Sequence, residues 1–180
     1  TLHSMFQLPF APYIPETTFN NNQRRFSFPK QKIRLLRSID VLVIDEVSMV
    51  RADVLDAIDS VLRRYRHRYK PFGGVQLLLI GDLQQLAPVV RQEDWDLLGK
   101  YYDSPYFFSS KALQQLDYYT IELKKVYRQS DPEFLNLLNM VRENRMTSEA
   151  LAHLNSRCIP NFDPPKEEGY IRLTSHNSQA

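Results

Sequence analysis

The stretch VLVIDEVSMVRADVLDAIDSVLRRYRHRYKPFGGVQLLLIGDLQQLAP, residues 41–88, decides the fold. It contains two continuous apolar runs, residues 41–44 and 75–80, of the kind typical of strands buried on both faces of a parallel sheet. Between them, residues 51–65 repeat apolar side chains along one helical stripe. Strand, helix and strand within about 40 residues predict a βαβ unit, and therefore an α/β fold with a parallel sheet.

The sequence predicts further elements on both sides of this unit. Residues 1–8 have helical spacing, and residues 9–32 are expected to be irregular because prolines and an Asn20–22 run interrupt them. Asp131 and Pro132 predict a helix start, with Asp as the N-cap and Pro in the first turn, and Thr147 with Ser148 predicts the start of a short one. We expect two more strands, at residues 118–123 and 171–174.

Glycine is scarce in this chain, which has 5 where an average usage of about 7% would give about 13. No six-residue window supplies the three glycines of a dinucleotide fingerprint. The single Gly-Lys pair, Gly99–Lys100, has Asp94 in place of the first P-loop glycine and Tyr101 after the lysine. The 180 residues therefore hold no glycine-rich phosphate loop.

Composition excludes several other classes of protein. A single cysteine, Cys158, excludes an internal disulfide, so no disulfide partner is expected. No apolar run reaches the roughly 18 residues of a membrane span, so no membrane partner is expected either. The four histidines lack metal-ligand spacing with one another or with Cys158, and no zinc site is predicted. A net charge of +2 permits nucleic-acid binding without arguing for it.

Acidic residues follow both central strands. Asp45–Glu46 comes directly after the first strand and Gly81–Asp82 after the second. Ligands of open α/β sheets bind at the carboxyl ends of the strands. An Asp there suits a magnesium ion held through its water shell, and a neighbouring Glu suits activation of an attacking water. The alternative is that Asp45 or Ser48 only caps the next helix.

Two polar groups could complete a phosphate site. Gln85, in the loop after the second strand, suits an amide that senses a terminal phosphate, although this loop could also be a plain turn. Arg128 follows the third expected strand and suits an arginine finger on a transferring phosphate. Alone, such a residue is more often an ordinary surface arginine.

Taken together, these segments resemble the PIF-type (petite integration frequency) DNA helicases of superfamily 1, relatives of RecD. The matching stretches occur in the family's order: TLHS at 1–4 (motif Ia), VIDEVSM at 43–49 (motif II), FGGVQ at 72–76 leading to GDLQQLAPV at 81–89 (motif III), YRQ at 127–129 (motif IV) and TSHN at 174–177. The family's P-loop precedes motif Ia and its motifs V and VI come later. The resemblance therefore implies a central fragment.

The resemblance implies a RecA-like P-loop NTPase fold and an ATP-driven motor that moves 5′ to 3′ on single-stranded DNA and unwinds duplexes. Residues 1–126 would form most of the first RecA-like domain, and residues 127–180 would begin the second. Asp45 would ligate Mg²⁺, Glu46 would activate water, Gln85 would sense the γ-phosphate of ATP, and Arg128 would be the finger.

The resemblance also implies DNA contacts and partners. Residues 9–32 take the place of the family's wedge insertion, and their basic and aromatic composition suits backbone contact and base stacking; they could instead form an arm that packs its aromatic side chains on the sheet. The predicted DNA-binding residues are Thr1, His3, Ser4, Arg24, Arg25, His176 and Asn177. Expected partners are single-stranded DNA and duplex junctions, with a monomer favoured. The expected compartment is the cytoplasm of a bacterium, or the nucleus or mitochondrion of a eukaryote. The competing interpretation is a non-catalytic nucleic-acid-binding module that keeps the fold.

Overall fold

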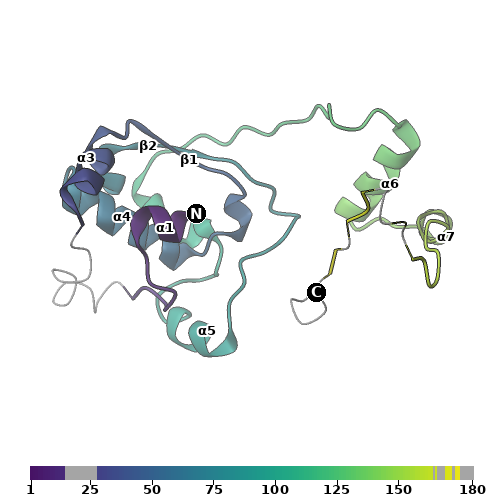
Figure 1. Ribbon diagram of the computed structural model, residues 1–180, viewed down its shortest axis with the longest axis horizontal. Helices are drawn as coiled ribbons and strands as arrows, with labels where there is room; N and C mark the ends of the chain where they lie inside the picture. Colours follow the sequence, from purple (N-terminus) through teal and green to yellow (C-terminus); the bar gives the residue numbers. More distant parts are fainter. Residues whose placement is uncertain (15–27, 164, 166–168, 172, 175–180) are drawn as a thin grey trace. The chain divides into compact units, whose positions relative to one another are not determined.

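A computed structural model of the chain describes residues 1–14, 28–163, 165, 169–171 and 173–174. The chain divides into two compact units, Thr1–Ile121 and Glu122–Ala180 (Figure 1). Among the described residues, none of the helices combines the length and hydrophobicity that crossing a bilayer requires.

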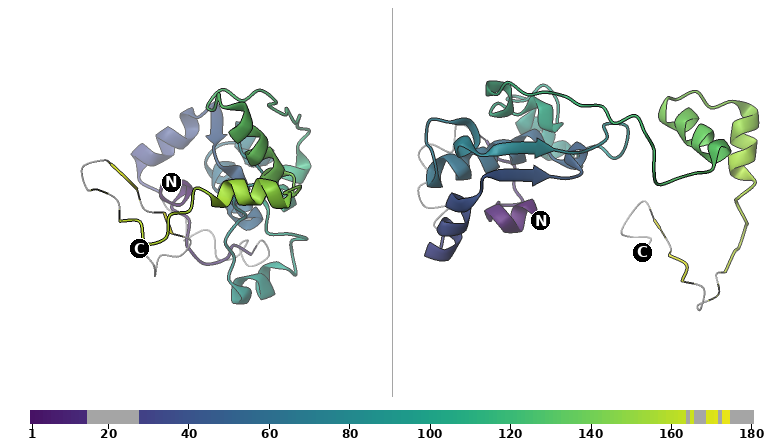
Figure 2. Two further views of the ribbon diagram at one scale, coloured as in Figure 1. Left: turned by 90° about the vertical axis from the view of Figure 1, so that its right-hand side faces the viewer. Right: turned by 90° about the horizontal axis from the view of Figure 1, so that it is seen from above.

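Two parallel strands form the sheet of the first unit. β1 (Val41–Ile44) pairs with β2 (Gln76–Leu79), and the register places Val41 opposite Gln76 and Ile44 opposite Leu79. The two arrows lie side by side and run in the same direction (Figure 2). Both predicted central strands and their parallel pairing are therefore confirmed, with β2 slightly shorter than residues 75–80.

Helix α4 (Ala52–Tyr65) connects the two strands, as the apolar stripe predicts. Its fully buried side chains include Leu55, Ile58, Val61 and Leu62, and they meet Phe72 in one hydrophobic core. Burying large apolar side chains at about 1.5–3 kcal/mol each makes α4 the main packing element of the unit. The core also contains Ile44 of β1, so the helix and the strand are held together directly.

Shorter elements complete both units. In the first unit they are α1 (Leu2–Phe6), α3 (Lys30–Ser38), η1 (Val47–Met49), η2 (Pro71–Gly74), α5 (Gln92–Leu98), η3 (Phe107–Ser109) and η4 (Leu113–Gln115). The second unit has α6 (Pro132–Arg142) and α7 (Ser148–Asn155). Asp131 and Thr147 cap these two helices with their side chains, which confirms both predicted starts.

Three expectations about the elements are wrong. Residues 118–123 form no strand, and neither do the described residues of 171–174. An extended segment becomes a strand only beside another, and the sheet of the described residues has two strands, β1 and β2. Residues 9–32 are not irregular throughout, because α3 begins at Lys30, directly after Pro29. Residues 15–27 of that stretch lie outside the described residues.

The strands are also less buried than their continuous apolar runs predict. Val41 and Val43 are about half exposed, at 48% and 52%, and so is Leu78 at 49%. Side chains alternate between the two faces of a sheet, and α4 covers the face that carries Ile44. In the part of the chain that the structure describes, the opposite face stays open.

Candidate active site

The carboxyl ends of β1 and β2 are joined by backbone hydrogen bonds. The Ile80 amide donates to the Ile44 carbonyl at 2.9 Å, and the Val47 amide donates to the Ile80 carbonyl at 2.9 Å. These two bonds bring the Asp45–Glu46 turn beside the Gly81–Asp82 turn. Two acidic stretches that are 36 residues apart in the sequence (45 to 81) therefore share one edge of the sheet.

Gly81 permits this close approach. A Cβ at this position would lie 3.0 Å from the Val47 amide nitrogen, 3.0 Å from Val47 Cγ1 and 3.1 Å from the Ser48 amide nitrogen. Backbone atoms cannot swing aside as the end of a flexible side chain can, so a larger residue would push the two turns apart. The glycine therefore sets the spacing between the turns that carry the predicted magnesium ligand and the predicted phosphate sensor.

Asp45 and Glu46 are both exposed at this edge. The Glu46 amide donates to Asp45 Oδ1 at 2.9 Å, which orients the Asp45 carboxylate. Glu46 itself has left-handed backbone angles, φ 53° and ψ 41°. That conformation costs a residue with a side chain roughly 1–2 kcal/mol, and such strain is concentrated at functional positions.

Asp82 organises the second turn. Its Oδ1 accepts from the Gln84 amide at 3.0 Å, and its Oδ2 accepts from Gln85 Nε2 at 3.2 Å. The Gln85 side chain is thus held by a carboxylate and lies on the exposed surface of the turn. Sequence reasoning identified Gln85 but did not foresee that Asp82 positions it.

The donor set at this edge fits magnesium held through water. Within the described ranges, no group of three or more His, Cys, Asp or Glu side chains gathers closely enough to hold a metal. Mg²⁺ usually keeps several waters and binds one or two carboxylates together with the phosphates of a nucleotide. Asp45 and Glu46 offer that kind of incomplete, exposed shell.

A partly buried ion pair follows this edge along the chain, at the start of α4. Arg51 Nε and Nη2 donate to the two Asp53 carboxylate oxygens at 2.8 and 2.7 Å, and Arg51 Nη1 lies 3.6 Å from Asp94 of α5. The hydrogen bond that Arg51 donates to Asp53 is the largest influence on Arg51 and raises the pKa of its guanidinium. Asp53 is 1% exposed and also accepts from the Tyr13 amide at 2.9 Å.

Asp56 is the next buried carboxylate along α4. It accepts from the Tyr102 hydroxyl at 2.8 Å, from Ser110 Oγ, and from the amides of Lys111 and Ala112. Burial, and then the Asp56 charge, raise the pKa of the Tyr102 hydroxyl. Asp53 and Asp56 are therefore both buried and both have direct hydrogen-bond partners, although they lie at the start of the helix. The sequence signal that could have indicated their burial is their spacing along the apolar stripe of α4.

The structure places only some of the predicted DNA-binding residues. Thr1 Oγ1 accepts from the Ser4 amide at 3.2 Å and caps α1, and His3 stacks on Phe10 with ring centroids 5.2 Å apart. Arg24, Arg25, His176 and Asn177 lie outside the described residues. Arg128 is exposed in the second unit, whereas Asp45, Glu46 and Gln85 belong to the first.

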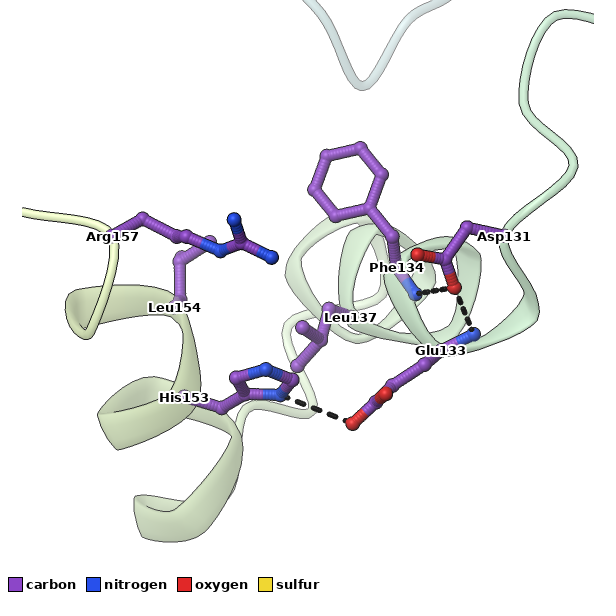
Figure 3. Close-up of a pocket in the computed structure, with 7 residues that line it drawn as sticks. All are labelled: Asp131, Glu133, Phe134, Leu137, His153, Leu154 and Arg157. Atoms are coloured by element: carbon purple, nitrogen blue, oxygen red, sulfur yellow. Dashed lines mark hydrogen bonds and ion pairs between the residues drawn. The ribbon is translucent and has the colours of Figure 1, made fainter.

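The second unit has a pocket of its own, of about 400 Å³, between α6 and α7 (Figure 3). Phe134, Leu137 and Leu154 line it together with Arg157. His153 Nδ1 lies 3.4 Å from a Glu133 carboxylate oxygen, and Asp131 Oδ1 accepts from the amides of the first helical turn. Of the residues predicted from the sequence for catalysis or DNA binding, none that the structure describes lines this pocket.

Comparisons with known proteins find relatives along most of the chain. Residues 1–150 match the family model described as PIF1-like helicase. The chain is 41% identical over 116 residues to the ATP-dependent DNA helicase PIF1 of Homo sapiens, covering 64% of this chain and 17% of that protein. It is 33% identical over 134 residues to the ATP-dependent DNA helicase RRM3 of Saccharomyces cerevisiae, covering 74% of this chain and 18% of that protein. The chain thus spans less than a fifth of the length of these two curated relatives.

A solved structure extends the similarity over almost the whole chain. It is the Pif1 helicase from Bacteroides in complex with ADP-AlF3 and single-stranded DNA, with a TM-score of 0.90 and 37% identity, covering 99% of this chain and 41% of that one. The predicted α/β, RecA-like fold class is thereby confirmed. With more than half of its residues matching the family model, the chain belongs to the PIF1-like helicase family.

Proposed function

We propose that this chain is part of an ATP-dependent DNA helicase that couples ATP hydrolysis to 5′-to-3′ movement on single-stranded DNA and to duplex unwinding. One observation carries the proposal: the Asp45–Glu46 turn lies beside the Gly81–Asp82 turn at the carboxyl edge of two parallel strands. This is the edge at which α/β folds bind their ligands. The nucleotide and single-stranded DNA in the Bacteroides relative support the proposal.

In this proposal each polar group at the edge has one task. Asp45 holds Mg²⁺ through its water shell, and bound Mg²⁺ supplies positive charge that neutralises the phosphates. Glu46 takes a proton from the attacking water, and Gln85, held by Asp82, contacts the γ-phosphate. Arg128 of the second unit stabilises the charge on the transferring phosphoryl group.

The proposed partners are single-stranded DNA and duplex junctions, and the proposed active form is a monomer. The proposed DNA contacts come from three parts of the sequence. They are Thr1, His3 and Ser4 at its start, Arg24 and Arg25 in the strand-separating insertion, and His176 and Asn177 near residue 180. We propose that residues 1–126 belong to a first RecA-like domain and residues 127–180 to a second. The proposed compartment is the cytoplasm in a bacterium, or the nucleus or mitochondrion in a eukaryote.

The test is the substitution Glu46→Gln in the complete gene product that carries this chain. We expect DNA-stimulated ATP hydrolysis to fall by about 10²–10⁴, the usual contribution of a general base, while nucleotide affinity is retained. Glu93→Gln, an exposed glutamate on α5, is the matched control and should change neither quantity. Unchanged hydrolysis in Glu46→Gln would refute the assigned base. A gene product that binds DNA without hydrolysing ATP would instead support the non-catalytic binding module.

A further inference from the structure

Helix α4 holds the backbone at two points, Tyr13 and Phe28, within residues 9–32, the stretch that the resemblance assigns to the DNA-facing insertion. The structure describes this stretch up to Ile14 and again from Phe28. Tyr13 and Phe28 each donate the backbone amide to a side chain of α4. The two acceptors lie at opposite ends of the helix.

The first attachment is to the N-terminal end of α4. The Tyr13 amide donates to Asp53 Oδ2 at 2.9 Å, and this carboxylate is 1% exposed. Arg51 grips the same carboxylate with two hydrogen bonds, at 2.8 and 2.7 Å. Charge-assisted bonds of this kind are about twice as strong as neutral ones, so Asp53 is a firm acceptor for Tyr13.

The second attachment is to the C-terminal end of α4. The Phe28 amide donates to the Tyr65 hydroxyl at 3.3 Å, and the two rings stack with centroids 5.0 Å apart and planes 19° apart. Phe28 is 7% exposed and belongs to the core cluster. Arg37 Nε of α3 also donates to the Tyr65 carbonyl at 3.1 Å, which fixes the helix end against the next element of the chain.

The two attachments have a fixed separation, because they sit on one rigid helix. Asp53 and Tyr65 are 12 positions apart (53 to 65), which corresponds to about 18 Å along an α-helix at 1.5 Å per residue. α4 cannot shift easily, since its inner face is buried in the core. The helix also starts at Ala52, shortly after Asp45–Glu46, with only η1 and a short turn between them.

We propose that Asp53 and Tyr65 are positioning residues, which fix the backbone at Tyr13 and at Phe28 of the first unit. Residues 9–32, the expected insertion, are thereby tied at these two points to the helix that follows the candidate ATP site. This proposal rests on the proposed helicase function. In this proposal the two residues do not contact ATP, but they are necessary for coupling ATP hydrolysis to strand separation.

A hydrogen-exchange experiment tests the attachments themselves. In the complete gene product, Tyr65→Phe removes one hydroxyl and keeps the ring stack, so we expect exchange at the Phe28 amide to become about fivefold faster while the Tyr13 amide is unchanged. Asp53→Asn should instead make exchange at the Tyr13 amide faster and leave exchange at the Phe28 amide unchanged. Tyr69→Phe makes the same substitution in an exposed ring (82%) four positions later and serves as the matched control. Unchanged exchange at Phe28 in Tyr65→Phe would overturn the proposal.

A coupling experiment tests the consequence. We expect the Asp53→Asn/Tyr65→Phe double variant to unwind a forked duplex about fivefold less per ATP hydrolysed, with unchanged hydrolysis on single-stranded DNA. A merely structural role would lower hydrolysis and unwinding together, and that result would overturn the proposal, as would unchanged unwinding per ATP. If the unmodified gene product neither hydrolyses ATP nor unwinds DNA, the proposed function fails, whereas the exchange experiment still decides whether α4 holds the backbone at Tyr13 and Phe28.

Discussion

Glu46 combines a catalytic expectation with a strained backbone. Its left-handed angles disfavour any residue with a Cβ, and the structure keeps it there between β1 and η1. We therefore expect Glu46→Gly to raise the free energy of unfolding of the chain by about 1 kcal/mol, because glycine adopts this conformation without steric cost.

Glu46→Gln keeps the Cβ and should leave the stability unchanged, which makes it the control for the strain. Urea denaturation of the two variants and the unmodified chain measures the difference. Both variants should lose ATP hydrolysis in the complete gene product. Equal stability of Glu46→Gly and Glu46→Gln would show that the backbone of residue 46 is not strained.

Substitutions at two neighbouring glycines of η2 can distinguish the cost of a strained backbone from the cost of a steric clash. Gly73 and Gly74 both have positive φ, at 61° and 78°. A Cβ on Gly73 would lie 2.6 Å from the Leu62 carbonyl oxygen of α4, whereas one on Gly74 would lie 3.3 Å from the flexible Lys70 side chain.

We expect Gly73→Ala to destabilise the chain by about 3 kcal/mol, since it adds a backbone clash to the conformational cost. Gly74→Ala should cost about 1–2 kcal/mol, the conformational term alone. Urea denaturation measures both. A Gly74→Ala variant as unstable as Gly73→Ala would contradict the assignment of the clash to Leu62.

At the scale of the element, α4 carries a buried carboxylate whose ionisation opposes folding. Burial is the largest influence on Asp59 and raises the pKa of its carboxyl above the ordinary value of 3.8. The opposing contributions come from Arg63, which donates at 2.8 Å, and from the Phe72 amide, while Asp56 raises the pKa further. The folded state therefore favours the protonated form of Asp59 more than the unfolded state does.

The sign of the pH dependence follows from this difference. A raised folded-state pKa contributes stability that is complete below the unfolded-state value and is lost as pH rises through the folded-state value. We expect the unmodified chain to lose stability relative to Asp59→Asn as pH rises above about 4. Urea denaturation of both proteins at several pH values measures this. Asp117→Asn, an exposed position, should show no such trend, and a trend of opposite sign for Asp59→Asn would refute the assignment.

The elements that the sequence predicted correctly are those with a local signal. The α4 stripe, the Asp131 cap and the Thr147 cap are each contained within one or two helical turns. Residues 118–123 have the composition of a strand, but strand formation depends on a partner elsewhere in the chain. Helix α3 escaped prediction because prolines dominated the stretch up to residue 32, although Pro29 lies directly before its first turn and is tolerated there.

At the scale of the whole molecule, the approach of the Asp45–Glu46 turn to the Gly81–Asp82 turn was predictable, because parallel strands bring their carboxyl ends to one edge. That rule placed Asp45 beside Asp82 without any knowledge of the intervening helix. It could not predict the contacts that Asp53 makes with Tyr13 and that Asp56 makes with Tyr102 and Ser110, since these three partners are remote in the sequence. Tertiary packing decides which buried polar groups meet. The only sign of such a contact in the sequence is a polar residue among the apolar residues of a helix.

The 180 residues taken alone should not work as a motor. Nucleotide hydrolases hold the β- and γ-phosphates with the backbone amides of a glycine-rich loop and with its lysine, and the sequence contains no G-x-x-x-x-G-K-[ST]. Asp45, Glu46 and Gln85 can act on a metal, a water and a terminal phosphate only after the nucleotide has been bound.

We therefore expect the purified chain to show no DNA-stimulated ATP hydrolysis and to bind ATP with a Kd above about 1 mM. The complete gene product, assayed in parallel with the same DNA, is the positive control. Hydrolysis by residues 1–180 that single-stranded DNA stimulates and that Glu46→Gln abolishes would contradict this expectation, and it would mean that the phosphates are held by residues other than a glycine-rich loop.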